Sequence, residues 1–220
     1  MNSIYYPVFL DLLGARVVVV GSAHGAGDLV ESLLHAGARV TLVAPQAEER
    51  LRRAGEEARL RWVPREYRLE DLEEAALVFA MDADPAQQHR VCEDARDLGL
   101  WVNRADEPLD STFLVPRVFE RGPLQVALHA DRSTPALDHA ALVAVAEALG
   151  HEFGVLAEWL AEPRSGVALR IPGEEFRHEL AEQVMKSEVP GLLRQGRHGP
   201  ARERFEEVRS RCEASWALPK

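Results

Sequence analysis

The sequence predicts an α/β fold in which a parallel sheet is followed by a smaller, mainly helical region. The strongest sign is the valine run at 17–20, which is apolar on both faces and suits a strand buried between two layers of helices. Glycines then cluster within 21–27, and leucines recur at helical spacing over 29–34. A second apolar strand follows at 39–44. Strand, glycine-rich turn, helix and strand form the first βαβ unit of a Rossmann-like, nucleotide-binding sheet.

The following elements continue this alternation. Asp84 and Pro85 suit the N-cap and first position of a helix that begins after a wholly apolar strand. Pro7 favours an edge segment over a central strand near the start of the chain. In chain order we expect an edge segment at 4–13, a helix at 48–59, a strand at 60–63, a helix at 69–76, a strand at 77–81, a helix at 85–98 and a strand at 100–105.

The pattern changes after residue 107. A loop leads to an alternating strand at 124–130, and Thr134 and Pro135 then start a helix that ends near Gly150. Prolines interrupt the helical segments beyond it and exclude one long helix. We therefore expect a Rossmann-like, nucleotide-binding domain at 1–112, a strand–helix region at 113–150 and a C-terminal helical region at 151–220.

The turn after the first strand is a candidate phosphate site. Its first, third and sixth places hold the small residues Gly21, Ala23 and Ala26, and backbone N–H groups in such a turn can point at a phosphate. The alternative is a tight turn without a ligand. A carboxylate about 20 residues further on usually holds a ribose hydroxyl. Pro45 and Gln46 stand after the second strand here, so the ribose would need another partner.

Ligands of open parallel sheets bind beyond the carboxyl ends of the strands. Asp106 and His129 are the titratable pair that we expect to share this edge, where they could pass protons near neutral pH. The alternatives are a turn aspartate and a surface histidine. Nearby arginines could bind carboxylates or form a solvated rim: Arg104, Arg117, Arg121 and Arg132.

Composition limits the class of protein. The formal net charge of −10 argues against a nucleic-acid partner and requires local arginines for any anionic substrate. No apolar run approaches the roughly 20 residues that span a membrane, and the start lacks the pattern of a signal peptide. Cys92 and Cys212 show no metal-ligand spacing and fit a reducing cytoplasm.

Three segments resemble precorrin-2 dehydrogenases, which form the N-terminal part of siroheme synthase: YYPVFLDLLGARVVVVG, LLHAGARVTLVAP and VNRADEPLDSTFLVPRVFERGPLQVAL. The resemblance covers residues 4–150 in consistent order. It implies NAD-dependent oxidation of precorrin-2 to sirohydrochlorin in a homodimer, with Fe²⁺ insertion as a second activity of many members. The region at 1–112 is then the NAD-binding domain, and the region at 113–150 is the dimerisation region.

The resemblance also implies site residues. Asp106 matches the family's essential aspartate, and we expect His129 to act beside it. For the tetrapyrrole carboxylates we expect Arg104, Arg117 and Arg132, and we expect no bound metal cofactor. The expected NAD contacts are Gly21, Ser22, Ala23, His24, Gly25, Pro45, Gln46, Met81, Asp82 and Asn103.

The sequence departs from the family at three places. Gly21-Ser22-Ala23 replaces three glycines, residues 129–132 replace a serine-glycine-glycine run, and Asp138-His139 replaces basic residues. Two alternatives therefore accompany the dehydrogenase: a divergent member that only inserts metal, and a non-catalytic, dimeric NAD sensor.

Overall fold

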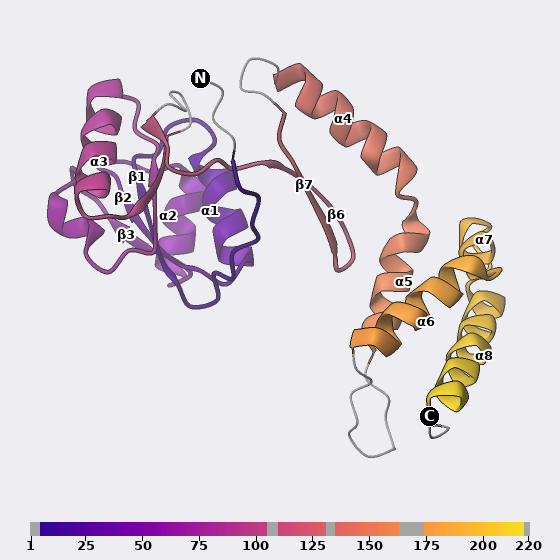
Figure 1. Ribbon diagram of the computed structural model, residues 1–220. Helices are drawn as coiled ribbons and strands as arrows, with labels where there is room; N and C mark the ends of the chain where they lie inside the picture. The colour runs from indigo at the N-terminus through magenta and orange to yellow at the C-terminus, as the bar shows by residue number, and fades with distance from the viewer. Residues whose placement is uncertain (1–4, 105–109, 131–134, 163–173, 218–220) are drawn as a thin grey trace. The chain divides into compact units, whose positions relative to one another are not determined.

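The computed structural model describes residues 5–104, 110–130, 135–162 and 174–217. The chain divides into two compact units, Met1–Val115 and Pro116–Lys220, which we describe separately (Figure 1). The boundary that we expected at 112/113 lies just before this division. The second expected boundary, at 150/151, lies within the second unit, between two of its helices.

The first unit contains a five-stranded parallel sheet in the order β3-β2-β1-β4-β5, which confirms the predicted α/β class. Its strands are β1 (Arg16–Val20), β2 (Arg39–Val43), β3 (Arg61–Val63), β4 (Leu77–Ala80) and β5 (Trp101–Arg104). The connecting elements are α1 (Ala26–His35), α2 (Glu49–Glu56), the short 3₁₀ helix η1 (Leu69–Leu72) and α3 (Pro85–Asp97). Central β1 pairs with β2 on one side and β4 on the other.

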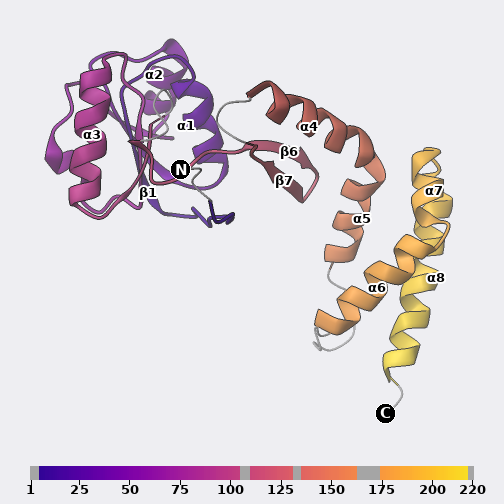
Figure 2. The same cartoon turned by 45° about the horizontal axis from the view of Figure 1, so that its top comes forward.

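Helices cover both faces of this sheet, with α1 and α2 on one side and α3 on the other (Figures 1 and 2). The valine run of β1 supplies both layers. Val17 and Val19 join the core that includes Leu33 and Leu51, whereas Val18 and Val20 join the core that includes Val91. Because side chains alternate along a strand, an unbroken apolar run serves a sheet buried on both faces.

Local signals set most of the element boundaries. Asp84 caps α3 by accepting a hydrogen bond from the N–H of Ala86 at 3.0 Å, with Pro85 at the first helical position, as predicted. One expectation differs, because the helix expected at 69–76 is the single turn η1. Residues 5–13, which we expected as an edge segment, form neither a helix nor a strand.

The second unit begins with an antiparallel hairpin of β6 (Arg117–Arg121) and β7 (Leu124–Leu128). Its two-residue loop starts at Gly122, whose φ of +56° suits the first position of such a turn. We did not predict β6, and β7 pairs with β6 in a sheet of its own, not with the parallel strands. The alternation along β7 was read correctly, but its partner was not.

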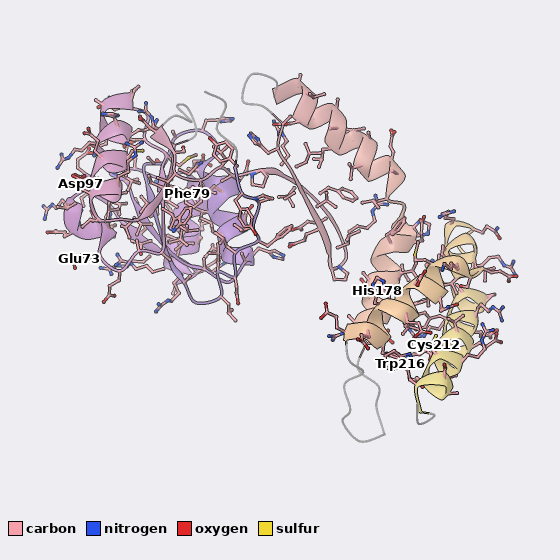
Figure 3. All side chains as sticks on the ribbon, viewed as in Figure 1. Glu73, Phe79, Asp97, His178, Cys212 and Trp216 are labelled. Atoms are coloured by element: carbon pink, nitrogen blue, oxygen red, sulfur yellow. The ribbon has the colours of Figure 1, made fainter. Side chains whose placement is uncertain are left out.

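Five helices follow: α4 (Pro135–Ala148), α5 (His151–Ala161), α6 (Glu174–Lys186), α7 (Val189–Arg194) and α8 (His198–Ala217). The last four enclose a core that includes Leu156, Leu180 and Phe205. Trp159 packs against Phe205. Trp216, at the end of α8 (Figure 3), packs against Phe176. The described part of the chain has no single helix long and apolar enough to cross a membrane, although α4 and α5, bent by 67°, reach that length and composition as a pair.

Candidate functional site

The turn after β1 is held by the carboxyl ends of two neighbouring strands. The N–H of Gly21 donates to Val43 O on β2 at 2.8 Å, and the N–H of Ala23 donates to Met81 O after β4 at 2.9 Å. Gly21 has a φ of +92°, and a Cβ there would lie 2.4 Å from the Cα of Asp82. Only glycine combines this conformation with this close approach. The turn therefore depends on Gly21.

Three N–H groups of the turn are available to a ligand. Among the described residues, the N–H groups of Ser22, His24 and Gly25 donate no hydrogen bond. Gly25 caps α1 with a φ of +88°, and a Cβ at this position would meet nothing within 4 Å. Free N–H groups beside a helix N-terminus in open space fit the pyrophosphate of a dinucleotide. Ala23, which stands at the usual middle glycine, uses its N–H to hold the turn.

The predicted residues after β2 lie beside this turn. Ser22 Oγ donates a hydrogen bond to Gln46 O at 2.7 Å, which draws the loop after β2 toward the glycine turn. Pro45 and Gln46 are both exposed. The structure thus brings together two sets of predicted cofactor residues that lie more than twenty residues apart in the sequence, as the hydrogen bond between residues 22 and 46 shows.

The predicted residues after β4 and within β5 have structural partners. Asp82 Oδ1 accepts a hydrogen bond from the N–H of Asp84 at 2.9 Å, and Asp82 O accepts one from Gln88 Nε2 at 2.7 Å. Asn103 is buried, and its Nδ2 donates to Phe113 O at 3.0 Å. Met81 is half-buried against the core of the sheet. These contacts hold the backbone in place at the carboxyl ends of β4 and β5, the edge of the sheet where a ligand is expected.

Arg104, a predicted substrate residue, is only 9% exposed and its NH1 lies 2.7 Å from Asp110 Oδ2. Asp110 also lies near Arg96 NH2 at 3.4 Å and His89 Nδ1 at 3.1 Å, both on α3. The hydrogen bond with His89 is the largest cause that lowers the pKa of the Asp110 carboxyl, while burial opposes it. The sequence analysis missed this cluster, whose members are scattered between 89 and 110.

Asp106 and Arg132 lie outside the described residues. His129 follows β7 of the hairpin, so the expectation that it ends a strand of the same sheet as Asp106 is wrong. The structure instead places Asp138 beside it, with Asp138 Oδ2 3.9 Å from His129 Nδ1. Asp138 Oδ1 also accepts a hydrogen bond from the N–H of Ala130 at 2.5 Å. Arg117 is exposed at the start of β6.

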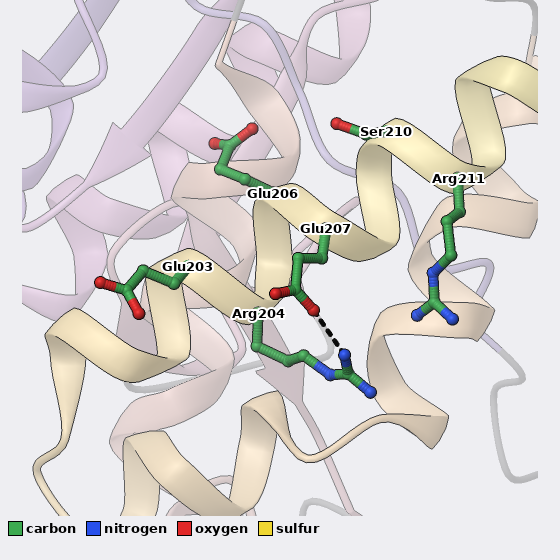
Figure 4. Close-up of a pocket in the computed structure, with 6 residues that line it drawn as sticks. All are labelled: Glu203, Arg204, Glu206, Glu207, Ser210 and Arg211. Atoms are coloured by element: carbon green, nitrogen blue, oxygen red, sulfur yellow. Dashed lines mark hydrogen bonds and ion pairs between the residues drawn. The ribbon is translucent and has the colours of Figure 1, made fainter.

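Two further observations bear on where in the described residues a ligand or metal could bind. The described residues contain no cluster of three or more histidine, cysteine or carboxylate side chains that could hold a metal ion. A shallow depression runs along α8 (Figure 4), where Arg204 pairs with Glu207. Its lining comes from this one helix and carries charges of both signs: Glu203, Arg204, Glu206, Glu207, Ser210 and Arg211. No second element of the described part of the chain lines it, so these residues do not enclose a large ligand.

The fold and the turn after β1 define a dinucleotide-binding protein of the Rossmann class. Residues 8–117 match the model of a family described as "Putative NAD(P)-binding". The chain belongs to this family, which confirms the nicotinamide dinucleotide that we expected.

Relatives with this sequence pattern are siroheme synthases. The chain is 28% identical over 190 residues to the siroheme synthase of Neisseria meningitidis serogroup C, covering 86% of this chain and 40% of that protein. It is 32% identical over 197 residues to siroheme synthase 1 of Halorhodospira halophila, covering 88% and 40%. The chain thus spans about two fifths of the length of these relatives.

Among solved structures, the fold is similar to that of SirC, a precorrin-2 dehydrogenase. The TM-score is 0.73 at 23% identity, over 92% of this chain and 100% of that one. The siroheme synthase relatives therefore confirm the resemblance seen in the sequence. The match to the SirC structure confirms the fold.

Proposed function

We propose that this protein oxidises precorrin-2 to sirohydrochlorin with NAD. The observation that carries the proposal is the glycine turn, whose three available N–H groups face the ligand edge of the sheet in a chain whose relatives are siroheme synthases. NAD, when bound, supplies the acceptor for a hydride from the tetrapyrrole. The N–H groups of Ser22, His24 and Gly25 hold its pyrophosphate, and residues 45–46 border its ribose.

Asp106 is the proposed proton acceptor. Removal of a hydride and a proton converts precorrin-2 to sirohydrochlorin, and a carboxylate can take that proton. The substrate's carboxylates need cations, although the whole chain has a formal net charge of −10. Arg117, exposed at the start of β6, and Arg132 are the candidates. Arg104 is already paired with Asp110 and acts as an indirect support.

A second activity, insertion of Fe²⁺ into sirohydrochlorin, is supported by His129 and Asp138. An imidazole beside a carboxylate can accept protons released by the macrocycle as metal enters. Because Fe²⁺ is a substrate of this step, the step needs no permanently bound metal ion at the described residues.

The protein is proposed to be a homodimer that works in the cytoplasm. Apolar residues after Gly150, such as Phe176 and Trp159, are a second candidate for the interface besides the region at 113–150. Phe176 is buried within its own unit, and Trp159 is partly buried there. Met185 and Trp216 are exposed in that part of the chain. Within 113–150, exposed apolar side chains lie on β6 and α4, at Val118, Leu137 and Val143. They support the 113–150 region as the interface. Light scattering that shows a monomer would contradict the dimer.

The test of the main proposal is turnover. Purified protein is mixed with NAD⁺ and precorrin-2, and the absorbance of sirohydrochlorin is followed. Asp106→Asn should lower turnover about 100-fold or more, the scale of general acid–base effects, while NAD affinity is unchanged. A dinucleotide sensor would bind NAD without turnover, and a chelatase would insert Fe²⁺ without NAD. Full activity of Asp106→Asn would remove the catalytic assignment.

A further inference from the structure

The first helical turns after β1 and β2 are joined by an arginine. Arg50 lies in the first turn of α2, and its NH1 is 2.6 Å from Asp28 Oδ1 on α1. Its Nε is 2.9 Å from Glu48 Oε2. The guanidinium lies against Gly27, where a Cβ would be only 2.2 Å from Arg50 Nε and NH2. Glycine at 27 therefore makes room for this cation beside the N-terminus of α1.

This place in the fold is close to where a dinucleotide places its adenosine ribose. In Rossmann-like sites, the ribose lies between the glycine turn and the end of the second strand. The hydrogen bond from Ser22 Oγ to Gln46 O brings those two segments together, and Arg50 follows Gln46 by four residues, in the first turn of α2. The ribose and Arg50 therefore belong to the same edge of the sheet.

The residues at the end of β2 do not discriminate against a 2′-phosphate. A carboxylate there normally binds the ribose 2′-hydroxyl of NAD and repels the phosphate of NADP, whereas a nearby arginine accommodates that phosphate. Ala44, Pro45 and Gln46 supply no carboxylate. Arg50 is 44% exposed, and its NH2 makes no hydrogen bond among the described residues.

We infer that Arg50 selects the coenzyme at the ribose 2′ position and allows this protein to bind NADP as well as NAD. Asp28 and Glu48 hold the guanidinium in place while the site is empty of phosphate, and the exposure of both carboxylates, 81% and 41%, lets them turn to water when a phosphate binds. The inference rests on the proposed nucleotide site, but not on the tetrapyrrole chemistry.

Calorimetric titration of the full chain with NAD⁺ and with NADP⁺, in the absence of tetrapyrrole, tests this. We expect the two dissociation constants of the unmodified protein to agree within about tenfold. Arg50→Gln should weaken NADP⁺ binding about tenfold or more, the scale of one lost charge-assisted contact, and change NAD⁺ binding by less than about twofold. Arg50→Lys keeps the charge and should recover part of the NADP⁺ affinity.

Arg52→Gln is the matched control. Arg52 lies in the same helix, has a similar exposure of 49% and pairs with Glu49, so its loss should leave both affinities unchanged. Equal weakening of NAD⁺ and NADP⁺ by Arg50→Gln, or no weakening, would overturn the role of Arg50 while the proposed function stands. A more than 100-fold preference of the unmodified protein for NAD⁺ would do the same. Failure of either nucleotide to bind the unmodified protein would overturn the nucleotide site itself.

Discussion

Arg104 and Asp110 form an ion pair, with Arg104 NH1 2.7 Å from Asp110 Oδ2, across the two ends of the segment that carries Asp106. A second link joins the same ends, since Ser111 Oγ accepts a hydrogen bond from the N–H of Arg104 at 2.8 Å and donates one to its carbonyl at 3.1 Å. Residues 104 and 111 are thus fixed to each other.

Asp110→Asn should lower both stability and turnover. The change removes a carboxylate that lies against Arg104, Arg96 and His89. We expect a loss of about 1–3 kcal/mol in the free energy of unfolding, because the buried guanidinium of Arg104 loses its contact with this carboxylate. Turnover should fall through kcat, with KM for NAD nearly unchanged. Urea unfolding and steady-state kinetics measure the two effects.

The control for this variant is Asp97→Asn, an exposed carboxylate at the end of α3 (Figure 3). This control variant should change the free energy of unfolding by no more than about 0.5 kcal/mol and leave turnover unchanged. Equal effects of the two variants would show that Asp110 has no special role in supporting the segment.

The contribution of Asp110 to stability should disappear on acidification. Its pKa in the folded protein is lowered from the ordinary value of 3.8, first by the hydrogen bond with His89. The unfolded chain therefore takes up this proton more readily than the folded one. The stabilisation is complete above the ordinary pKa of 3.8 and is lost as pH falls below it toward the folded value.

Urea midpoints of the unmodified protein and Asp110→Asn, measured at several pH values, test this sign. The difference between the two midpoints should be largest near neutral pH and shrink in the acid range below the ordinary pKa. A difference that grows as pH falls would mean that the ion pair does not stabilise the folded protein.

Two glycines of the same turn should respond differently to alanine. Gly21 combines a φ of +92° with a Cβ position 2.4 Å from the backbone of Asp82, whereas Gly25, at +88°, faces open space. Gly25→Ala should cost about 1–2 kcal/mol from its left-handed conformation alone. Gly21→Ala should cost about 3 kcal/mol or more, because backbone atoms must also move. Urea unfolding of both variants makes the comparison, and equal costs would contradict the close approach.

The buried carboxylate of Glu152 should make the second unit sensitive to the loss of Arg194. Glu152 lies in the first turn of α5 and is 3% exposed, and its Oε1 lies 2.6 Å from Arg194 Nε at the end of α7. Arg194→Met leaves this carboxylate without its cation. We expect a loss of about 2 kcal/mol, below the cost for a fully buried pair, because Arg194 itself is 60% exposed.

Adding Glu152→Gln to that variant should recover part of the loss, since the uncompensated charge is then removed. Lys186→Met is the comparison: its partner Glu182 is exposed, and the change should cost no more than about 0.5 kcal/mol. Urea unfolding measures all three. A negligible cost for Arg194→Met would mean that Glu152 is protonated or finds another partner.

The sequence by itself determined the elements whose signals are local. The valine run, the glycines after it and the Asp84-Pro85 pair specify a buried strand, a glycine turn and a helix start, and each lies where it was expected. These signals depend on which conformations neighbouring residues allow, so they can be read without knowing what packs against them. Family membership followed from the same segments.

Only the tertiary structure decided which distant side chains meet. Alternation along 124–128 indicates a strand but not its partner, so the hairpin with β6 and the separation of His129 from the parallel sheet were missed. Arg50 against Gly27, Arg104 against Asp110 and Asp138 against His129 arise from different elements packing together. The number of residues between the partners of each pair follows no regular pattern, because such contacts are set by the positions of whole helices and strands in space.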